Sequence, residues 1–374
     1  MDTQFSSYLS LSSHATFQLF AIWFVGAFWT KLKVFNRKAV EGLIDYNEFL
    51  IPMLVFTHIL KGFDITDFSN WLPVIVIFMI HIVIGAIIGL CLSYFSAQRH
   101  NALRFFISSL CLPQTLTLQL LLIENFAPVI ESISQSSGQV FSITARNRAL
   151  NYVIVWYLFE HLLRTTVCSF FMTSDANQIK EKGDDYHKIR DESEEDERSS
   201  TNGIVLTEVF SISFVTFIIT IILAFISPVK TALLDQSSIF YSTIFVSSDL
   251  IAKTWRVMVI FVFGTALPLI KLDACNLSLT DHILNAATKL VIFPLFGYLI
   301  IYLFLQGYSW FKDPVLIFIM LIQFSSPTSF GLFKTATQRT QLGNDFLVSL
   351  TVQHIAAIII LTLLNAVWSM QLSA

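Results

Sequence analysis

Two apolar segments of this sequence are each interrupted by a proline that small polar side chains follow. A proline inside a helix removes one backbone hydrogen bond and clashes with the preceding turn, at a cost of about 3 kcal/mol. Within lipid, such an interruption is tolerated only where neighbouring groups or water satisfy the freed backbone. The residues at the two interruptions are Pro113, Gln114, Thr115, Pro327, Thr328 and Ser329.

These two interruptions could together form a binding site for an anion. Broken helices that meet near the middle of a membrane present the N-termini of their second halves to a shared cavity. Each N-terminus carries partial positive charge and unpaired N–H groups, so it can hold an anion without a full cationic side chain. We therefore predict that the six residues bind substrate. The alternative is a pair of simple kinks, each packed by its neighbours.

Ionisable residues inside apolar segments are costly, which makes them further functional candidates. Glu160 and Arg164 lie four residues apart on one helical face, a spacing that favours a structural ion pair. For Lys289 we expect an anchor at the cytoplasmic end of its helix, with a counter-charge for substrate as the alternative. His354 is expected to be a hydrogen-bonded core residue. The carboxylates that could couple transport to an ion are Glu124, Glu160 and Asp249.

The composition places these residues in a membrane protein. Hydrophobic residues make up 55% of the chain and charged residues 13%, whereas a soluble domain carries about 25% charged residues. The mean hydropathy is +0.68, and a water-soluble fold could not bury so much apolar surface. The net charge of -3 comes largely from residues 175–198, so we expect no nucleic-acid partner.

No catalytic or metal-binding pattern accompanies these segments. The sequence contains no HExxH, GxSxG or P-loop motif, so we expect neither an enzyme nor a cofactor. The missing P-loop argues against ATP-driven pumping by this chain alone. Energy would come from a gradient or the membrane potential. The cysteines have no zinc-like spacing, so we expect buried, inert thiols and no metal at Cys91, Cys111, Cys168 and Cys275.

The apolar segments predict an all-α membrane protein with about ten transmembrane helices, since about 20 apolar residues cross a bilayer. The seventh is the weakest, because Lys253 and Arg256 lie near its start and residues 237–248 could be an interfacial or re-entrant piece. Nine or eleven helices are the alternatives. The predicted spans are residues 14–31, 43–61, 72–95, 104–126, 149–172, 206–227, 251–270, 284–306, 314–334 and 346–370.

A polar, acidic stretch at residues 174–203 divides five predicted helices from five, and we expect a disordered cytoplasmic linker there. An odd number of crossings inverts the second half, so residues 1–173 and 204–374 should form an inverted repeat. The prolines support it: Pro52 precedes Pro113 by 61 residues and Pro268 precedes Pro327 by 59. The distribution of Lys and Arg indicates that both termini are outside or lumenal, which leaves the glycosylation sequon at residues 276–278 unused.

Four short motifs give the chain a family resemblance. They are GLIDYNEFLIPMLVFTHI (42–59), LPQTL (112–116), VWYLFEHLLR (155–164) and SSPTSFGLFK (325–334). In order and spacing they resemble the plant auxin efflux carriers and their PIN-like relatives. The resemblance implies a scaffold domain and a transport domain with crossed fourth and ninth helices. It also implies elevator-like alternating access, often as a homodimer, and an aromatic carboxylate as substrate.

Two departures from the family pattern narrow this expectation. Gln114 stands where the plant carriers have an asparagine, and Thr328 follows Pro327, so the amide pair of the family site is altered. Auxin itself is therefore not assigned as the substrate. The linker at 174–203 is short compared with that of the plasma-membrane branch, which favours a multi-pass protein of the endoplasmic reticulum.

The sequence thus favours a secondary carrier or uniporter for a small organic anion of the auxin-like carboxylate class. One alternative is a sodium- or proton-coupled symporter of the same fold. Another is a membrane receptor or scaffold that acts through the central linker. Deletion of residues 174–203 would distinguish a receptor or scaffold from a carrier, because a carrier would keep its flux and a scaffold would lose its function.

Overall fold

The computed structural model describes residues 2–62, 71–136, 144–168, 172, 212–270, 272–307 and 313–373. Within them the chain is almost entirely helical, and the one β-type pairing is an isolated bridge. The predicted linker at 174–203 lies outside the described residues. The first-half helices are α1 (Asp2–Lys31), α2 (Arg37–Gly62), α3 (Trp71–Ser93), α4 (Arg99–Cys111), α5 (Thr117–Asn125), α6 (Ala127–Ser136) and α7 (Ala145–Leu163).

The described residues of the second half of the chain are also helical. Helices α14 and α15 are joined by a π-helical turn, Thr288–Ile292, into one continuous rod. The helices are α11 (Ile212–Phe225), α12 (Ser227–Leu234), α13 (Val246–Ala266), α14 (Leu279–Ala287), α15 (Phe293–Gly307), α16 (Pro314–Phe324), α17 (Phe330–Arg339) and α18 (Gly343–Ser373).

Five of the described helices are long and apolar enough to cross a membrane, or six if the pair α11 and α12, bent by 103°, is counted as one span. Large apolar side chains point outward, among them Phe17 on α1 and Leu295 on α15, 72% and 65% exposed. Such surfaces suit lipid rather than water. The helical class and the integral, multi-pass membrane assignment are therefore confirmed. The count of ten, the inverted repeat and the crossing of the fourth and ninth helices stay predictions.

The seventh predicted span begins earlier than expected. Residues 241–266 form one continuous helix, a π-helical turn (Tyr241–Phe245) followed by α13, so a separate re-entrant piece is absent from this described stretch. Lys253, one of the charges near its start, is paired within the helix: Asp249 lies 2.8 Å from Lys253 and 2.7 Å from Lys61 of α2. A lysine paired in this way is compatible with a helix that continues into lipid.

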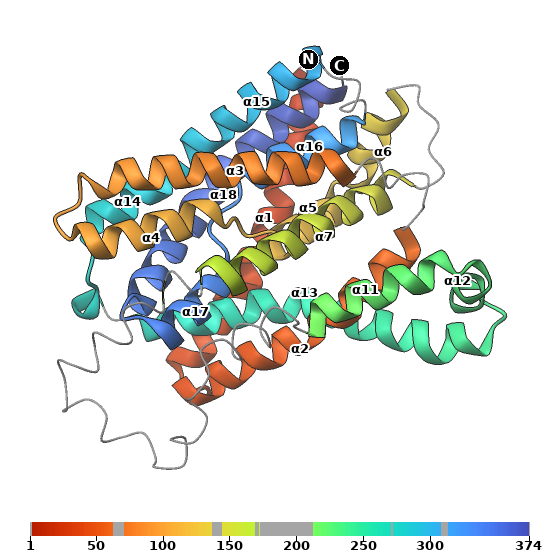
Figure 1. Cartoon of the computed structure of the whole chain (residues 1–374), viewed down its shortest axis with the longest axis horizontal. Helices are drawn as coiled ribbons and strands as arrows, with labels where there is room; N and C mark the ends of the chain where they lie inside the picture. Colours follow the sequence, from red (N-terminus) through yellow and green to blue (C-terminus); the bar gives the residue numbers. More distant parts are fainter. Residues whose placement is uncertain are drawn as a thin grey trace.

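The helices pack in two groups that Figure 1 places on opposite sides of the molecule. In the lower group α2 packs along α13 and α11, and in the upper group α3 packs along α4 and α14 along α18. Helix α1 joins the groups, since it contacts both α13 and α18. Its crossing with α13 is close: a Cβ on Gly26 would meet the carbonyl oxygen of Phe261, and one on Gly264 that of Trp23. Small residues permit such backbone contact between membrane helices.

Candidate transport site

The two proline interruptions lie against each other. Helix α4 ends at Cys111 and α5 begins at Thr117, while α16 ends at Phe324 and α17 begins at Phe330. Between them, Pro113 and Thr328 form an antiparallel bridge.

Two backbone hydrogen bonds hold this bridge. The Gln114 N–H donates to the Pro327 carbonyl at 2.6 Å, and the Ser329 N–H donates to the Leu112 carbonyl at 3.0 Å. Each break therefore supplies partners for the backbone groups that the other leaves unpaired, as a low-dielectric interior requires.

Buried polar side chains from both halves of the chain brace the bridge. The Thr328 N–H donates to Gln353 Oε1 at 2.6 Å, and the Thr328 hydroxyl lies 2.6 Å from that of Ser109. The amide of Asn285 donates to Ser109 at 2.7 Å and to Ser349 at 2.8 Å. A connected, buried network of this kind holds its members in one geometry.

A carboxylate lies beside the bridge. Glu160 accepts a hydrogen bond from the Thr115 hydroxyl at 3.4 Å and one from the side chain of Ser329. Its second partner is Arg164, 3.5 Å away, and both side chains are almost fully buried. The predicted ion pair is thus present, and it contacts residues of both interruptions.

A pocket opens next to the bridge and contains one of the six predicted site residues, Gln114. The pocket lies between α1, α5, α13, α17 and α18. Its walls are apolar and aromatic, its polar end combines Gln114 with His354, and none of the described lining residues bears a permanent charge. The lining residues are Thr16, Phe20, Trp23, Gln114, Leu122, Val259, Ile260, Phe263, Phe330, His354, Ala357, Ile358 and Leu361.

The polar end of the pocket has two alternative hydrogen-bonding states. His354 Nδ1 lies 2.7 Å from the Leu350 carbonyl, which can only accept, so Nδ1 carries a proton. The other nitrogen, Nε2, lies 2.7 Å from Gln114 Oε1, and rotation of the amide can place either its oxygen or its NH₂ there. A neutral ring must accept there from the amide NH₂, whereas a protonated ring donates to the amide oxygen and leaves the NH₂ to a ligand.

Both helices that follow the interruptions have open N-termini. Neither α5 nor α17 has a side chain that caps its first N–H groups. Phe330, the first residue of α17, and Leu122 of α5 line the pocket. The partial positive charge at the N-terminus of α17 is therefore close to the cavity, whereas α5 contributes a residue from its second half.

Lys289 is not the cytoplasmic anchor that we predicted. It is 0% exposed, its Nζ donates to the Leu110 carbonyl at 2.7 Å, and it faces the ring of Phe293 at 4.8 Å. An anchor needs a charged head in water. Here the ammonium instead satisfies a carbonyl in the last turn of α4, just before the first interruption, where the helix dipole favours a cation.

None of the three predicted coupling carboxylates lines the pocket. Glu124 pairs with Arg146 at 2.6 Å, and Asp249 pairs with Lys61 and Lys253. Sequence reasoning missed His354 as part of the site, because a lone histidine in an apolar helix gives no local signal of a partner 240 residues away.

An integral, helical membrane protein of this kind, with paired helix interruptions beside an internal pocket, falls in the class of membrane transporters. The chain belongs to the membrane transport protein family, which matches residues 11–365 and comprises the auxin efflux carriers and PIN-like proteins. The resemblance drawn from the sequence is thereby confirmed. No curated protein matches the chain. The family is one of transporters rather than enzymes.

Proposed function

We propose that this protein is a secondary carrier or uniporter for a small organic anion of the auxin-like carboxylate class. The observation that carries the proposal is the pocket, whose aromatic walls and whose polar end at Gln114 and His354 match a molecule with an aromatic body and one carboxylate. Gln114 and the open N-termini of α5 and α17 would hold the carboxylate, while Phe20, Trp23 and Phe263 would contact the ring. Thr115, Thr328 and Ser329 would keep the two interruptions in register.

Alternating access by an elevator-like movement fits the position of the pocket. Its walls come from α1 and α13 on one side and from α5, α17 and α18 on the other. The first pair would belong to a scaffold and the second set to a moving transport domain, so the movement would carry the site past the scaffold. A homodimer and residence in the endoplasmic reticulum belong to the same proposal.

Uptake of labelled aromatic carboxylates into proteoliposomes under an imposed potential tests this function. Gln114→Leu should weaken uptake roughly 10- to 100-fold, because a hydrogen bond to a charged group contributes about 1.5–3 kcal/mol. Gln371→Leu is the matched control, since Gln371 lies on exposed α18 surface and bonds Tyr298 instead. Absence of uptake of every carboxylate by folded protein would refute the proposal.

A proton-coupled symporter is the second candidate, and the pairing of His354 with Gln114 favours it. Only the protonated ring leaves the amide NH₂ to a carboxylate, so a proton and an anion would bind together. Glu160, between Thr115 and Arg164, is the other group that could take up the proton. Uptake would then depend on a pH gradient, and His354→Asn would abolish that dependence. Uptake that does not change with the pH gradient would contradict the symporter and favour the uniporter.

A further inference from the structure

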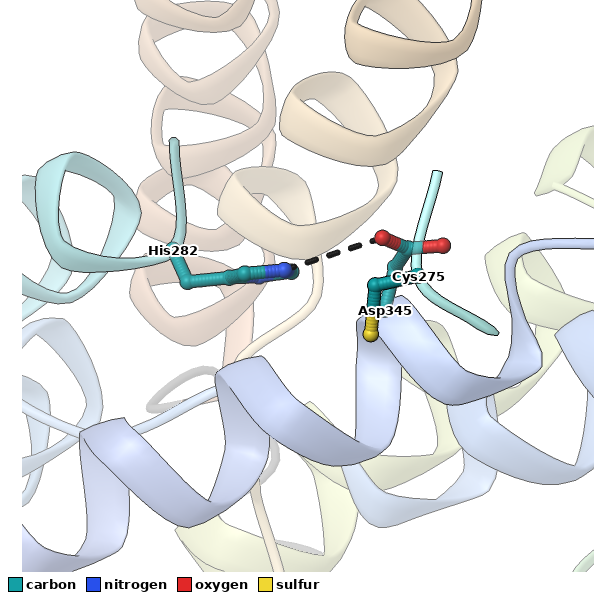
Figure 2. A group of neighbouring side chains, drawn as sticks. All are labelled: Cys275, His282 and Asp345. Atoms are coloured by element: carbon teal, nitrogen blue, oxygen red, sulfur yellow. Dashed lines mark ion pairs between the residues drawn. The ribbon is translucent and has the colours of Figure 1, made fainter. Parts of the chain in front are cut away.

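A second cluster of chemically active side chains lies away from the pocket. Cys275 precedes α14, His282 is on α14, and Asp345 is in the first turn of α18. One potential ligand atom from each lies within 4.8 Å of the other two. Figure 2 shows the imidazole and the carboxylate pointing toward each other with the sulfur beside them.

The histidine of this cluster has no hydrogen bond of its own. His282 is 1% exposed, and neither ring nitrogen has a hydrogen-bond partner. Its Nε2 is 3.6 Å from Asp345 Oδ1, which is too long for a hydrogen bond. Phe105 packs edge-on against the ring at 5.4 Å and holds it in place. A buried, unpaired imidazole aimed at a carboxylate and a thiol calls for a ligand between them.

The spacing suits a metal ion. Bond lengths of zinc sites put tetrahedral ligand atoms about 3.3 Å apart for nitrogen and oxygen and about 3.6 Å apart when sulfur is one of them. The observed 3.6 Å between His282 Nε2 and Asp345 Oδ1 is close to this value. All three ligand atoms lie within 4.8 Å of one another, and rotation of the side chains can bring them to the shorter distances that a bound ion requires. A cluster of sulfur, nitrogen and oxygen donors favours zinc over magnesium or calcium.

The surroundings already orient the carboxylate. Asp345 accepts hydrogen bonds from the backbone N–H groups of Asn276, at 3.2 Å, and Leu277, at 2.8 Å. These bonds fix its position as outer groups do around metal ligands. Oδ2 also accepts from the Asn276 side chain, whereas Oδ1 accepts the one bond from Leu277 and has a lone pair left over for an ion. The thiolate is the form of cysteine that binds a metal, so a bound ion would replace the thiol proton of Cys275.

We propose that Cys275, His282 and Asp345 form a binding site for a zinc-like divalent ion, with a fourth coordination position open. The partly exposed sulfur gives the ion its route in from solvent. Bound metal would join the segment before α14 to the start of α18, two parts of the chain that are distant in sequence and adjacent in space. The site is separate from the pocket and does not depend on the proposed transport function.

Zinc binding to the purified full-length chain, stripped with a chelator and dialysed against Zn²⁺, tests the proposal. We expect one ion per chain, and at least about 10-fold weaker binding in Cys275→Ser and in His282→Ala. Co²⁺ in place of Zn²⁺ should give the visible bands of tetrahedral cobalt and a near-ultraviolet band from thiolate to metal, the latter lost in Cys275→Ser.

Matched controls are Cys91→Ser and His14→Asn, which change an exposed cysteine on α3 and an exposed histidine on α1. Because Cys275 is partly exposed, its replacement leaves the packing intact and carries the test if His282→Ala does not fold. The proposal is overturned if zinc stoichiometry is unchanged in Cys275→Ser, if Cys91→Ser loses as much binding, or if bound cobalt shows no thiolate band.

Discussion

The charged pair that joins α7 to α16 allows a quantitative prediction. Asp313 lies 3.1 Å from Arg148 Nε, and their side chains are 5% and 3% exposed. Asp313 also accepts from the Tyr152 hydroxyl at 2.8 Å and from the Val315 N–H at 3.0 Å, which caps α16. Asp313→Asn keeps a residue that caps equally well but leaves Arg148 as an uncompensated buried cation, which should cost about 3–5 kcal/mol of stability.

A second substitution distinguishes this cause from general damage. Adding Arg148→Met to Asp313→Asn removes the unpaired cation, so the double variant should regain most of the loss and lie within about 2 kcal/mol of the wild type. The measurement is equilibrium unfolding in detergent micelles, followed by tryptophan fluorescence. Glu124→Gln is the control: its pair with Arg146 is 24% and 42% exposed and should contribute less than about 1 kcal/mol.

Two results would refute this reasoning about the Arg148–Asp313 pair. One is a loss in Asp313→Asn no greater than in Glu124→Gln, which would mean that water reaches the arginine. The other is strict additivity of Asp313→Asn and Arg148→Met, which would mean that the two charges do not interact.

Three further perturbations have defined outcomes. Gly264→Leu should destabilise the protein by about 2 kcal/mol or more, because its side chain would enter the backbone of α1 at Trp23; equal melting temperatures of variant and wild type would contradict this. Lys289→Met should leave stability within about 2 kcal/mol of the wild type, because loss of the hydrogen bond to Leu110 is offset by removal of a buried charge. Uptake into proteoliposomes should fall in this variant. Unchanged uptake would show that the charge of Lys289 contributes to packing alone. Pro113→Ala should abolish uptake with expression retained, as measured by fluorescent fusion yield, and lost expression would instead favour a structural kink.

The features of the fold and of the site that depend on neighbouring residues in the sequence could be predicted. The helical membrane class follows from long apolar segments, and both interruptions fall inside predicted spans, 104–126 and 314–334, because proline and the polar residues after it stand out against an apolar background. The pairing of Glu160 with Arg164 follows from helical spacing.

Features that depend on contacts between distant segments were not predictable in this way. Lys289 looked like an anchor because its charge is visible in the sequence and its carbonyl partner, 179 residues away, is not. Asn285 and Gln353 are single polar residues in apolar helices, and the packing alone reveals that they meet Ser109 and Thr328. The seventh span was predicted to start too late because Lys253 suggested a boundary. Asp249 pairs with Lys253 one turn away and with Lys61 of α2, and only the second of these contacts is hidden from the sequence.

The reciprocal bonding of the two interruptions has a consequence for biogenesis. When the segment around Pro113 leaves the ribosome and enters the membrane, the partners of Leu112 and Gln114 have not been synthesised, because they are the backbone groups of Ser329 and Pro327. Until almost the whole chain has been made, these groups of Leu112 and Gln114 lack the partners that they have in the folded protein and depend on water or on other neighbours. Premature termination before Pro327 would leave them permanently in that state.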